Sequence, residues 1–291
     1  MKIFKYLFEA VFVYLLFLLI RVLGLNFGRT ICSFLLLKIG FLFRSQKLIK
    51  KNILNAFRGL SESEINEIIK NMWKNYGYIL AEYVHIEKFR KNKFSKPHIR
   101  LSGKKILEEV IKSNKPVIFI SGHFGNFELM AMELEKNKIN LAAIYRPLNN
   151  MFLNPLMVFL RKKYICKNQI EKGMIGARRT VDYLKKNYSI ALMVDQRLGE
   201  SEKYPFFNKP AHTTTLPAQL ALKFNCKIIP VYLERLEKNL FNMEVLPPLE
   251  IEKTNNIDND KKKITIKINE VIEKMVLRNP GQWIWTHGRW K

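Results

Sequence analysis

The sequence contains few cysteines, and those present are far apart. Only three occur among 291 residues, Cys32, Cys166 and Cys226, and none belongs to a CxxC pair. An odd number of widely spaced cysteines argues against a disulfide framework and against a cysteine zinc site. The same pattern favours a reducing compartment.

Several motifs of common enzyme classes are also absent. Ser121 is not part of a G-x-S-x-G elbow, which argues against a hydrolase triad. The five histidines show no H-E-x-x-H or other metal-ligand spacing. The sequence has no glycine-rich phosphate loop and no dinucleotide-binding fingerprint. It therefore predicts no metal site.

Acidic residues are scarce relative to basic ones. The chain has 50 Lys and Arg against 25 Asp and Glu, a formal net charge of +25. One interpretation is a well-solvated, lysine-rich surface. The other is a densely anionic partner, namely nucleic acid, an acidic protein or a membrane surface that carries phosphates. Charge alone does not choose among these.

Long apolar runs are confined to the amino terminus. Ala10–Ile20 is uninterrupted, and Ile31–Phe43 contains a single lysine. The first run is shorter than the roughly 18–20 residues of a clean transmembrane helix. Glu9 directly before this run, and the absence of a small-x-small cleavage site after it, argue against a signal peptide. We expect residues 1–45 to form a retained membrane anchor, either one tilted spanning helix or a hairpin seated in the interface.

The remainder, residues 46–291, has the pattern of one α/β domain. Ser61-x-x-Glu64 is a capping box that opens a helix. Short apolar runs then alternate with helical periodicity, and the predicted strands are 117–121, 141–145, 190–194, 227–233 and 241–246. This alternation predicts a mostly parallel, mixed sheet flanked by helices on both faces. We expect the polar segment Glu252–Lys263 to be a surface loop.

The stretch VIFISGHFGNFE places a histidine at the junction between a predicted buried strand and the helix that follows it. His123 and Glu128 are five residues apart, so on one helix they would point about 140° apart. They can meet only if His123 lies on the turn before the helix, and Gly122 and Gly125 suit such a turn. A histidine oriented by a carboxylate is a general base. The alternative is a histidine that caps the helix start, with Glu128 complementing the helix dipole.

Two further polar clusters follow predicted strands. Arg146 follows 141–145, and Asp195, Gln196 and Arg197 follow 190–194. The carboxyl ends of parallel strands meet at one edge of a sheet, so we expect these clusters to converge with His123. An arginine held there suits phosphate or carboxylate recognition. The alternative for Arg146 is an ordinary surface arginine.

The carboxyl terminus is rich in tryptophan. Trp283, Trp285 and Trp290 are interleaved with His287 and Arg289. Such a cluster can be a base-stacking platform for nucleic acid. We favour the alternative, a tail that packs in the core or lies at a membrane interface.

These motifs together resemble the bacterial lipid A biosynthesis acyltransferases, the lauroyl and myristoyl transferase group of the lysophospholipid acyltransferase superfamily. The resemblance covers nearly the whole chain. After the apolar anchor, the matching segments are GHFGNFE (His123, Glu128), YRPLNN (Tyr145–Asn150), the DQ of Asp195-Gln196, YPFFNKPAHTTTLPAQLALKF (Tyr204–Phe224) and QWIWTHGRWK (Gln282–Lys291).

The resemblance implies a glycerolipid acyltransferase-like fold and an O-acyltransferase activity. A fatty acyl chain would pass from an acyl carrier protein thioester to a hydroxyl of a lipid A precursor of the Kdo-lipid IVA type. His123 would be the general base, and Glu128 would hold its Nδ1–H. The expected substrate-binding residues are Arg146, Asn149, Asn150, Asp195, Gln196 and Arg197.

The resemblance implies no cofactor. The expected partners are acyl carrier protein, a phosphorylated glycolipid acceptor and a membrane, but not nucleic acid. The expected location is the bacterial inner membrane, with the catalytic domain on its cytoplasmic face.

Two other functions fit the sequence. One is a lysophospholipid or other glycolipid O-acyltransferase with the same signature. The other is a membrane-tethered basic protein that binds nucleic acid or anionic lipid without catalysis. His123 and Glu128 would then be dispensable.

Overall fold

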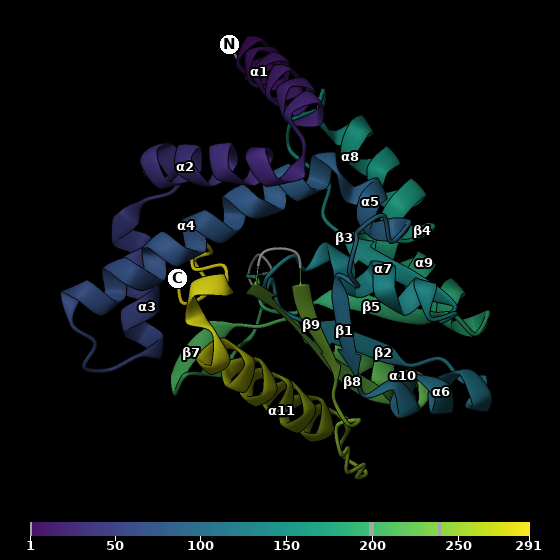
Figure 1. The fold of residues 1–291 in the computed structure, drawn as a ribbon. Helices are drawn as coiled ribbons and strands as arrows, with labels where there is room; N and C mark the ends of the chain where they lie inside the picture. The colour runs from purple at the N-terminus through teal and green to yellow at the C-terminus, as the bar shows by residue number, and fades with distance from the viewer. Residues whose placement is uncertain (1, 198–200, 238–239) are drawn as a thin grey trace.

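A seven-stranded sheet forms the centre of the molecule in the computed structural model, which describes residues 2–197, 201–237 and 240–291 (Figure 1). The strand order is β1-β9-β8-β2-β5-β3-β4, and every neighbouring pair is parallel except β8 and β9. This confirms the predicted mostly parallel, mixed sheet. The strands are β1 Ile99–Ser102, β2 Ile118–Ser121, β3 Leu141–Tyr145, β4 Asn168–Glu171, β5 Ser189–Met193, β8 Ile228–Glu237 and β9 Leu240–Val245.

Helices cover both faces of the sheet, because alternate strand residues point to opposite sides. Ile118 and Ile120 of β2 belong to one hydrophobic cluster, and Phe119 between them belongs to another. The first cluster includes residues of α9 Met174–Lys185, α10 Leu216–Phe224 and α11 Ile257–Arg278. The second includes residues of α6 Lys104–Ser113 and α7 Glu128–Lys136.

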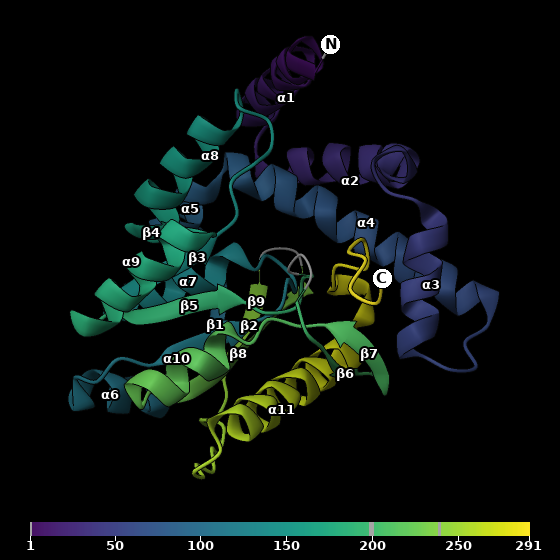
Figure 2. The same cartoon turned by 180° about the vertical axis from the view of Figure 1, so that it is seen from behind.

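The amino-terminal helices lie across one end of this layered domain (Figures 1 and 2). They are α1 Lys2–Leu23, α2 Leu25–Phe43, α3 Gln46–Ala56, α4 Glu62–Val84 and α5 Ile86–Arg90. Both bonds of the predicted capping box at Ser61 and Glu64 are present at the start of α4. By length and composition, α1 and α2 are each apolar enough to cross a membrane, although one third of the α2 window is buried in the protein.

The remaining elements surround the carboxyl edge of the sheet and the chain terminus. They are α8 Asn154–Leu160, the π-helical turn η1 Arg161–Ile165, the hairpin of β6 Lys203–Phe206 and β7 Lys209–His212, and the 3₁₀ turn η2 Pro280–Gln282. Trp283 and Trp285 are buried beside this turn. Their burial confirms a core-packing tail, because a base-stacking platform requires exposed rings.

The structure differs from the sequence prediction at several elements. The segment Glu252–Lys263 is not a loop throughout, since α11 begins at Ile257 after Asn256, whose side chain accepts a hydrogen bond from the Asn259 amide. Most of the polar residues there lie on the solvent face of an amphipathic helix, whereas Asp260 is buried and accepts hydrogen bonds from Thr254. The hairpin of β6 and β7 was not predicted. Strands β1 and β4 were not predicted either. They are short, partly exposed strands at the two edges of the sheet, so they lack the apolar runs of the central strands.

Candidate active site

His123 lies on the turn that connects β2 to α7, as predicted. Gly125 has a positive φ of 51°, a conformation that favours glycine. Gly122 allows a close approach, because a Cβ there would lie 2.6 Å from the Phe124 ring and 3.1 Å from Asp195 Oδ2. Both glycines therefore serve the geometry of this turn.

Contacts from distant segments hold the turn in place. The Asn75 side chain in α4 donates to the Gly125 carbonyl over 3.0 Å, and the Gly125 amide donates to the Gln282 carbonyl over 3.2 Å. Asn126 donates to Glu82 Oε2 over 2.8 Å. The turn is thus fixed by α4 on one side and by the carboxyl terminus on the other.

Asp195 orients His123. Its Oδ1 lies 2.7 Å from His123 Nδ1, and its Oδ2 accepts from the His123 amide over 2.7 Å and from Trp283 Nε1–H over 2.8 Å. The two residues meet because β2 and β5 are neighbouring parallel strands, with Ser121 opposite Met193. His123 and Asp195 each follow this residue pair by two positions, so both side chains lie at the same edge of the sheet.

The environment of Asp195 keeps its carboxylate ionised. Burial alone would raise the pKa of Asp195, but the interaction with His123 and its two hydrogen bonds outweigh burial and hold the pKa below its usual range. An ionised carboxylate only accepts, so Nδ1 carries a proton, and in the neutral imidazole the lone pair is on Nε2. The Gln196 side-chain nitrogen lies 3.1 Å from Nε2. Nε2 is thus the atom available to take a proton.

The prediction that Glu128 holds the Nδ1–H of His123 is wrong, because Asp195 occupies that place. Glu128 is the first residue of α7, and its Oε1 accepts from Tyr83 Oη–H over 2.5 Å and from Arg161 Nη2–H over 2.6 Å. Burial alone would lower the pKa of Arg161, but Glu128 and Tyr83 raise it overall. Glu128 therefore neutralises a partly buried arginine.

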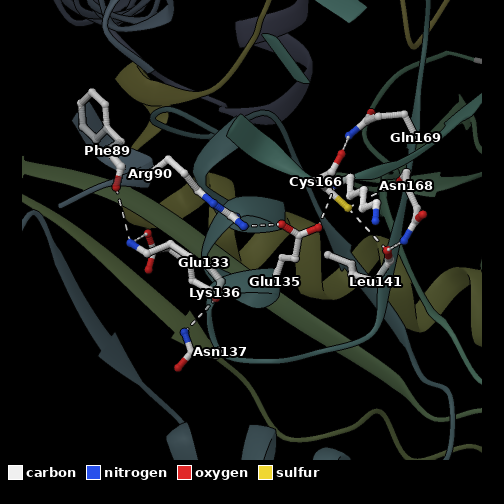
Figure 3. A network of polar contacts seen from close by, with 11 residues as sticks. Phe89, Arg90, Glu133, Glu135, Lys136, Asn137, Leu141, Cys166, Asn168 and Gln169 are labelled. Carbon is white, nitrogen blue, oxygen red and sulfur yellow. Dashed lines mark hydrogen bonds and ion pairs between the residues drawn. The ribbon is translucent and has the colours of Figure 1, made fainter. Parts of the chain in front are cut away.

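A polar network fixes the turn that carries Arg161. Figure 3 shows Glu135 of α7 between Arg90 and the start of β4. Arg90 Nη2 lies 2.7 Å from Glu135 Oε2, and the Lys167 amide donates to Glu135 Oε1 over 2.8 Å. The Cys166 thiol donates to the Leu141 carbonyl over 3.5 Å. These contacts hold η1 against α7 and so keep Arg161 beside Glu128.

The site opens on an apolar pocket of about 640 Å³ at the carboxyl ends of β3 and β5. This volume lies within the roughly 300–1,000 Å³ of typical small-molecule sites. His123, Gln196, Arg146, Glu128 and Arg161 are among its polar lining residues. The apolar lining comes from strands β3 and β5 and from the surrounding helices and turns: Phe127, Met130, Ala131, Ala143, Ile144, Ile165, Met174, Ala177, Ala191, Leu192, Met193 and Leu216.

The predicted convergence of polar clusters holds for His123, Arg146, Asp195 and Gln196, and Asp195 contacts His123 directly without lining the pocket. His123, Arg146 and Gln196 follow β2, β3 and β5, and all three line the pocket. Asn149 is exposed outside it, and Asn150 contacts α1, donating to the Tyr6 carbonyl over 2.8 Å. Arg197 is half-buried and does not line the pocket either. Roles in substrate binding stay predictions for Asn149, Asn150 and Arg197, and equally for Arg146, Asp195 and Gln196.

The sequence reasoning missed Arg161, Tyr83 and the contact between Trp283 and Asp195. Arg161 follows a helix rather than a strand, so the strand-end pattern gave no signal for it. Trp283 stood out only as part of an aromatic tail. In the part of the chain that the structure describes, no group of three or more His, Cys, Asp and Glu side chains could hold a metal ion.

Comparison with known proteins gives a consistent result across the chain. Residues 2–291 match the family described as bacterial lipid A biosynthesis acyltransferase. The chain is 26% identical to lipid A biosynthesis acyltransferase 2 of Shigella flexneri over 80% of this chain and 74% of the relative. It is 24% identical to the lipid A biosynthesis palmitoleoyltransferase of Escherichia coli K12, covering 86% of this chain and 80% of the relative. It is also 24% identical to the lauroyltransferase of the same organism, covering 89% of this chain and 83% of the relative. The chain therefore belongs to the bacterial lipid A biosynthesis acyltransferases, a membrane-associated family, and its activity is acyl transfer in lipid A biosynthesis.

Proposed function

We propose that this protein transfers a fatty acyl chain from an acyl carrier protein thioester to a hydroxyl of a lipid A precursor of the Kdo-lipid IVA type, with His123 as the general base. The observation that carries the proposal is the His123–Asp195 pair on the wall of an apolar pocket of about 640 Å³. Such a pocket suits an acyl chain, and the base beside it suits activation of a hydroxyl.

The reaction requires one proton acceptor and no covalent enzyme intermediate. His123 Nε2 takes the proton of the acceptor hydroxyl as that oxygen attacks the thioester carbonyl carbon. The new C–O bond forms, the C–S bond breaks, and the imidazolium returns the proton to the departing thiolate. Asp195 stabilises the imidazolium in between through the Nδ1–H bond. Gln196 must move off Nε2 to admit the hydroxyl.

Arg146 is the residue that we assign to anion recognition at this site. It is exposed, it lines the pocket, and it directly follows β3. Its guanidinium suits a phosphate of the acceptor or the oxyanion that develops on the thioester carbonyl. Arg161 lies in the same pocket, but its charge is already balanced by Glu128.

Charge and location support the proposed partners. Acyl carrier protein is acidic and the acceptor carries phosphates, so a chain of net charge +25 attracts both. We propose that the protein works on the cytoplasmic face of the bacterial inner membrane. The apolar α1 and α2 would hold the pocket at the surface where the acceptor lies.

The test uses the full-length protein in membranes with a labelled acyl carrier protein thioester and a tetra-acylated lipid A precursor. We expect the wild type to label the lipid and His123→Ala to lose nearly all of this transfer. Lys112→Ala changes an exposed residue of α6 that does not line the pocket and serves as the control. The variants are compared at equal amounts of protein. Each must have the same melting temperature as the wild type, so that a loss of transfer does not reflect unfolding.

The other outcomes separate the alternatives. Equal lipid labelling by wild type and His123→Ala would overturn the general-base assignment. Labelling of an added lysophospholipid but not of the lipid A precursor would favour the alternative acceptor. Transfer from acyl-coenzyme A but not from acyl carrier protein would overturn the proposed donor.

A further inference from the structure

Helix α1 is almost entirely apolar and projects from the domain. It has 22 residues, or about 33 Å at 1.5 Å per residue, which is enough to cross a hydrocarbon core of about 30 Å. Only 11% of its apolar window is buried in the protein. Length and composition therefore allow α1 either to span a bilayer or to lie within one leaflet.

The loop after β3 is attached to α1 at two points. The Tyr14 hydroxyl donates to the Phe152 carbonyl over 2.9 Å. The Asn150 side chain donates to the Tyr6 carbonyl over 2.8 Å and lies 3.3 Å from Glu9 Oε2. Figures 1 and 2 both show the loop before α8 reaching alongside α1. Residues 150–152 thus lie beside the part of α1 between Tyr6 and Tyr14.

The opposite end of α1 is fixed at the protein surface. Arg21 donates to the Val84 carbonyl over 3.2 Å and lies 3.6 Å from Glu87 of α5, and its side chain is about half exposed. Glu9 is twelve positions earlier, about 18 Å along the helix axis. If α1 crossed the bilayer with Arg21 at one surface, Glu9 and Asn150 would therefore lie beyond the middle of the hydrocarbon core.

A spanning placement is therefore energetically unfavourable. It would carry the irregular loop into hydrocarbon together with the exposed side chain of Asn149. Irregular backbone that faces lipid at this depth leaves polar groups unpaired, at several kcal/mol for each group. An inclined helix within one leaflet keeps the same loop at the headgroups.

Helix α2 supplies a second apolar surface on the same side. It lies along α4. The backbone of Ser33 in α2 approaches Gly77 of α4 so closely that a Cβ on Gly77 would lie 2.3 Å from the Ser33 Cα. Phe27, Phe34 and Phe41 are seven residues apart, so they share one face of α2, and all three are exposed. Lys38 lies 5.9 Å from the centre of the Phe34 ring. This is the pattern of an interfacial helix with a flanking cation.

The segment 148–163 continues this surface beside α1. Leu148, Met151 and Phe159 are exposed. Lys162 and Lys163 are exposed as well, and Lys163 Nζ lies 5.1 Å from the centre of the Phe159 ring. Apolar side chains with adjacent lysines suit a leaflet that carries anionic headgroups.

We propose that α1, the phenylalanine face of α2 and the segment 148–163 form one docking surface for a single leaflet of an anionic bilayer. Helix α1 does not cross the membrane, and the amino terminus stays on the side of the catalytic domain. Arg146, which lines the pocket, precedes this surface by two residues. Docking therefore presents the pocket to the lipid headgroups.

The test is the sidedness of single cysteines in the full-length protein. Lys5→Cys places a thiol on the exposed amino-terminal part of α1, and Lys112→Cys places one on exposed α6. The native cysteines are buried, so unmodified protein gives the background. Membrane vesicles of each orientation are treated with a membrane-impermeant maleimide, and detergent-solubilised samples give complete labelling.

We expect both introduced cysteines to react in vesicles of the same orientation and neither in the opposite orientation. Reaction of Lys5→Cys from the side opposite to Lys112→Cys would overturn the proposal, as would protection of Lys5→Cys from both sides. This readout does not depend on acyl transfer, so it stands apart from the proposed function.

A second measurement tests the contribution of α2. The triple variant Phe27→Ser, Phe34→Ser, Phe41→Ser should weaken partitioning into anionic vesicles by at least about tenfold, because each ring loses its burial in lipid. Leu277→Ser changes an equally exposed apolar residue on α11 and should leave partitioning unchanged. Equal partitioning of all three proteins would remove α2 from the docking surface.

Discussion

At the scale of single residues, two carboxylates near His123 have separate tasks. Asp195 contacts Nδ1 and the backbone amide of His123, whereas Glu128 contacts Arg161 and Tyr83. Asp195 is buried and held ionised, so it can stabilise a positive imidazolium. Glu128 instead keeps the partly buried Arg161 paired at the pocket wall. Removing either carboxylate should therefore produce a different defect.

Asp195→Asn should lower kcat by about 10²–10⁴-fold and leave KM for the acyl donor nearly unchanged. The amide fills the same space but no longer stabilises the imidazolium or fixes its tautomer. Initial rates at varied donor concentration measure both constants. A rise in KM at constant kcat would show instead that Asp195 acts in binding.

His287 predicts a pH dependence of stability. Burial lowers the pKa of His287 to about 4, and the nearby charges of His123, Arg44 and Arg146 act in the same direction while Asp195 opposes them. Between pH about 6.5 and about 4 the unfolded chain binds a proton that the folded protein excludes, so stability falls as pH falls through this window. Between pH 7 and pH 4, the melting temperature of His287→Gln should fall by less than that of the wild type. Parallel curves for the two proteins would contradict this assignment.

At the scale of secondary-structure elements, one buried carboxylate joins α2 and α4 to the rest of the domain. Glu82 is fully buried and contacts Arg29 of α2, Arg235 of β8 and Asn126 of the catalytic turn. The first of these contacts joins the predicted anchor, residues 1–45, to the domain that follows it. The same carboxylate thus connects an apolar helix to the turn that carries His123.

Glu82→Gln should lower the free energy of unfolding by about 3–5 kcal/mol, because it leaves two buried arginines without their counter-charge. Glu62→Gln removes an exposed carboxylate from the same helix and is the matched control. Chemical denaturation in detergent micelles measures both. Equal stability of the two variants would show that the buried pairs contribute little.

At the scale of the whole molecule, net charge and apolar helices act together on membrane binding. The charge of +25 predicts attraction to anionic lipid, and a salt concentration of about 0.1 M screens exposed charges beyond roughly 10 Å. Basic residues near the surface each contribute about 1 kcal/mol to binding of anionic membranes.

Binding to vesicles that contain phosphatidylglycerol should therefore weaken steadily as salt rises from about 0.05 to about 0.5 M. Binding to neutral phosphatidylcholine vesicles should be weaker and nearly independent of salt, since only the burial of apolar side chains in the lipid then contributes to binding. Sedimentation of vesicles with bound protein measures both series. Equal salt dependence on the two lipids would show that the basic surface does not face the membrane.

The sequence by itself determined the features that depend on local pattern. Apolar runs and their breaks predicted β2, β3, β5 and β8, because a strand buried on both faces excludes polar residues along its length. They also placed His123 on a turn, and the parallel order of strands predicted that Arg146 and Gln196 would lie near it.

The tertiary structure alone decided which carboxylate meets the histidine. Glu128 is five residues from His123 and Asp195 is seventy-two, yet Asp195 makes the contact. Sequence distance gave no signal for this choice, because the pairing of β2 with β5 and the position of Arg161 set the directions of both side chains. The attachment of α1 to the loop after β3 is decided in the same way. The catalytic pair and the position of α1 thus both depend on contacts between segments that are remote in the chain.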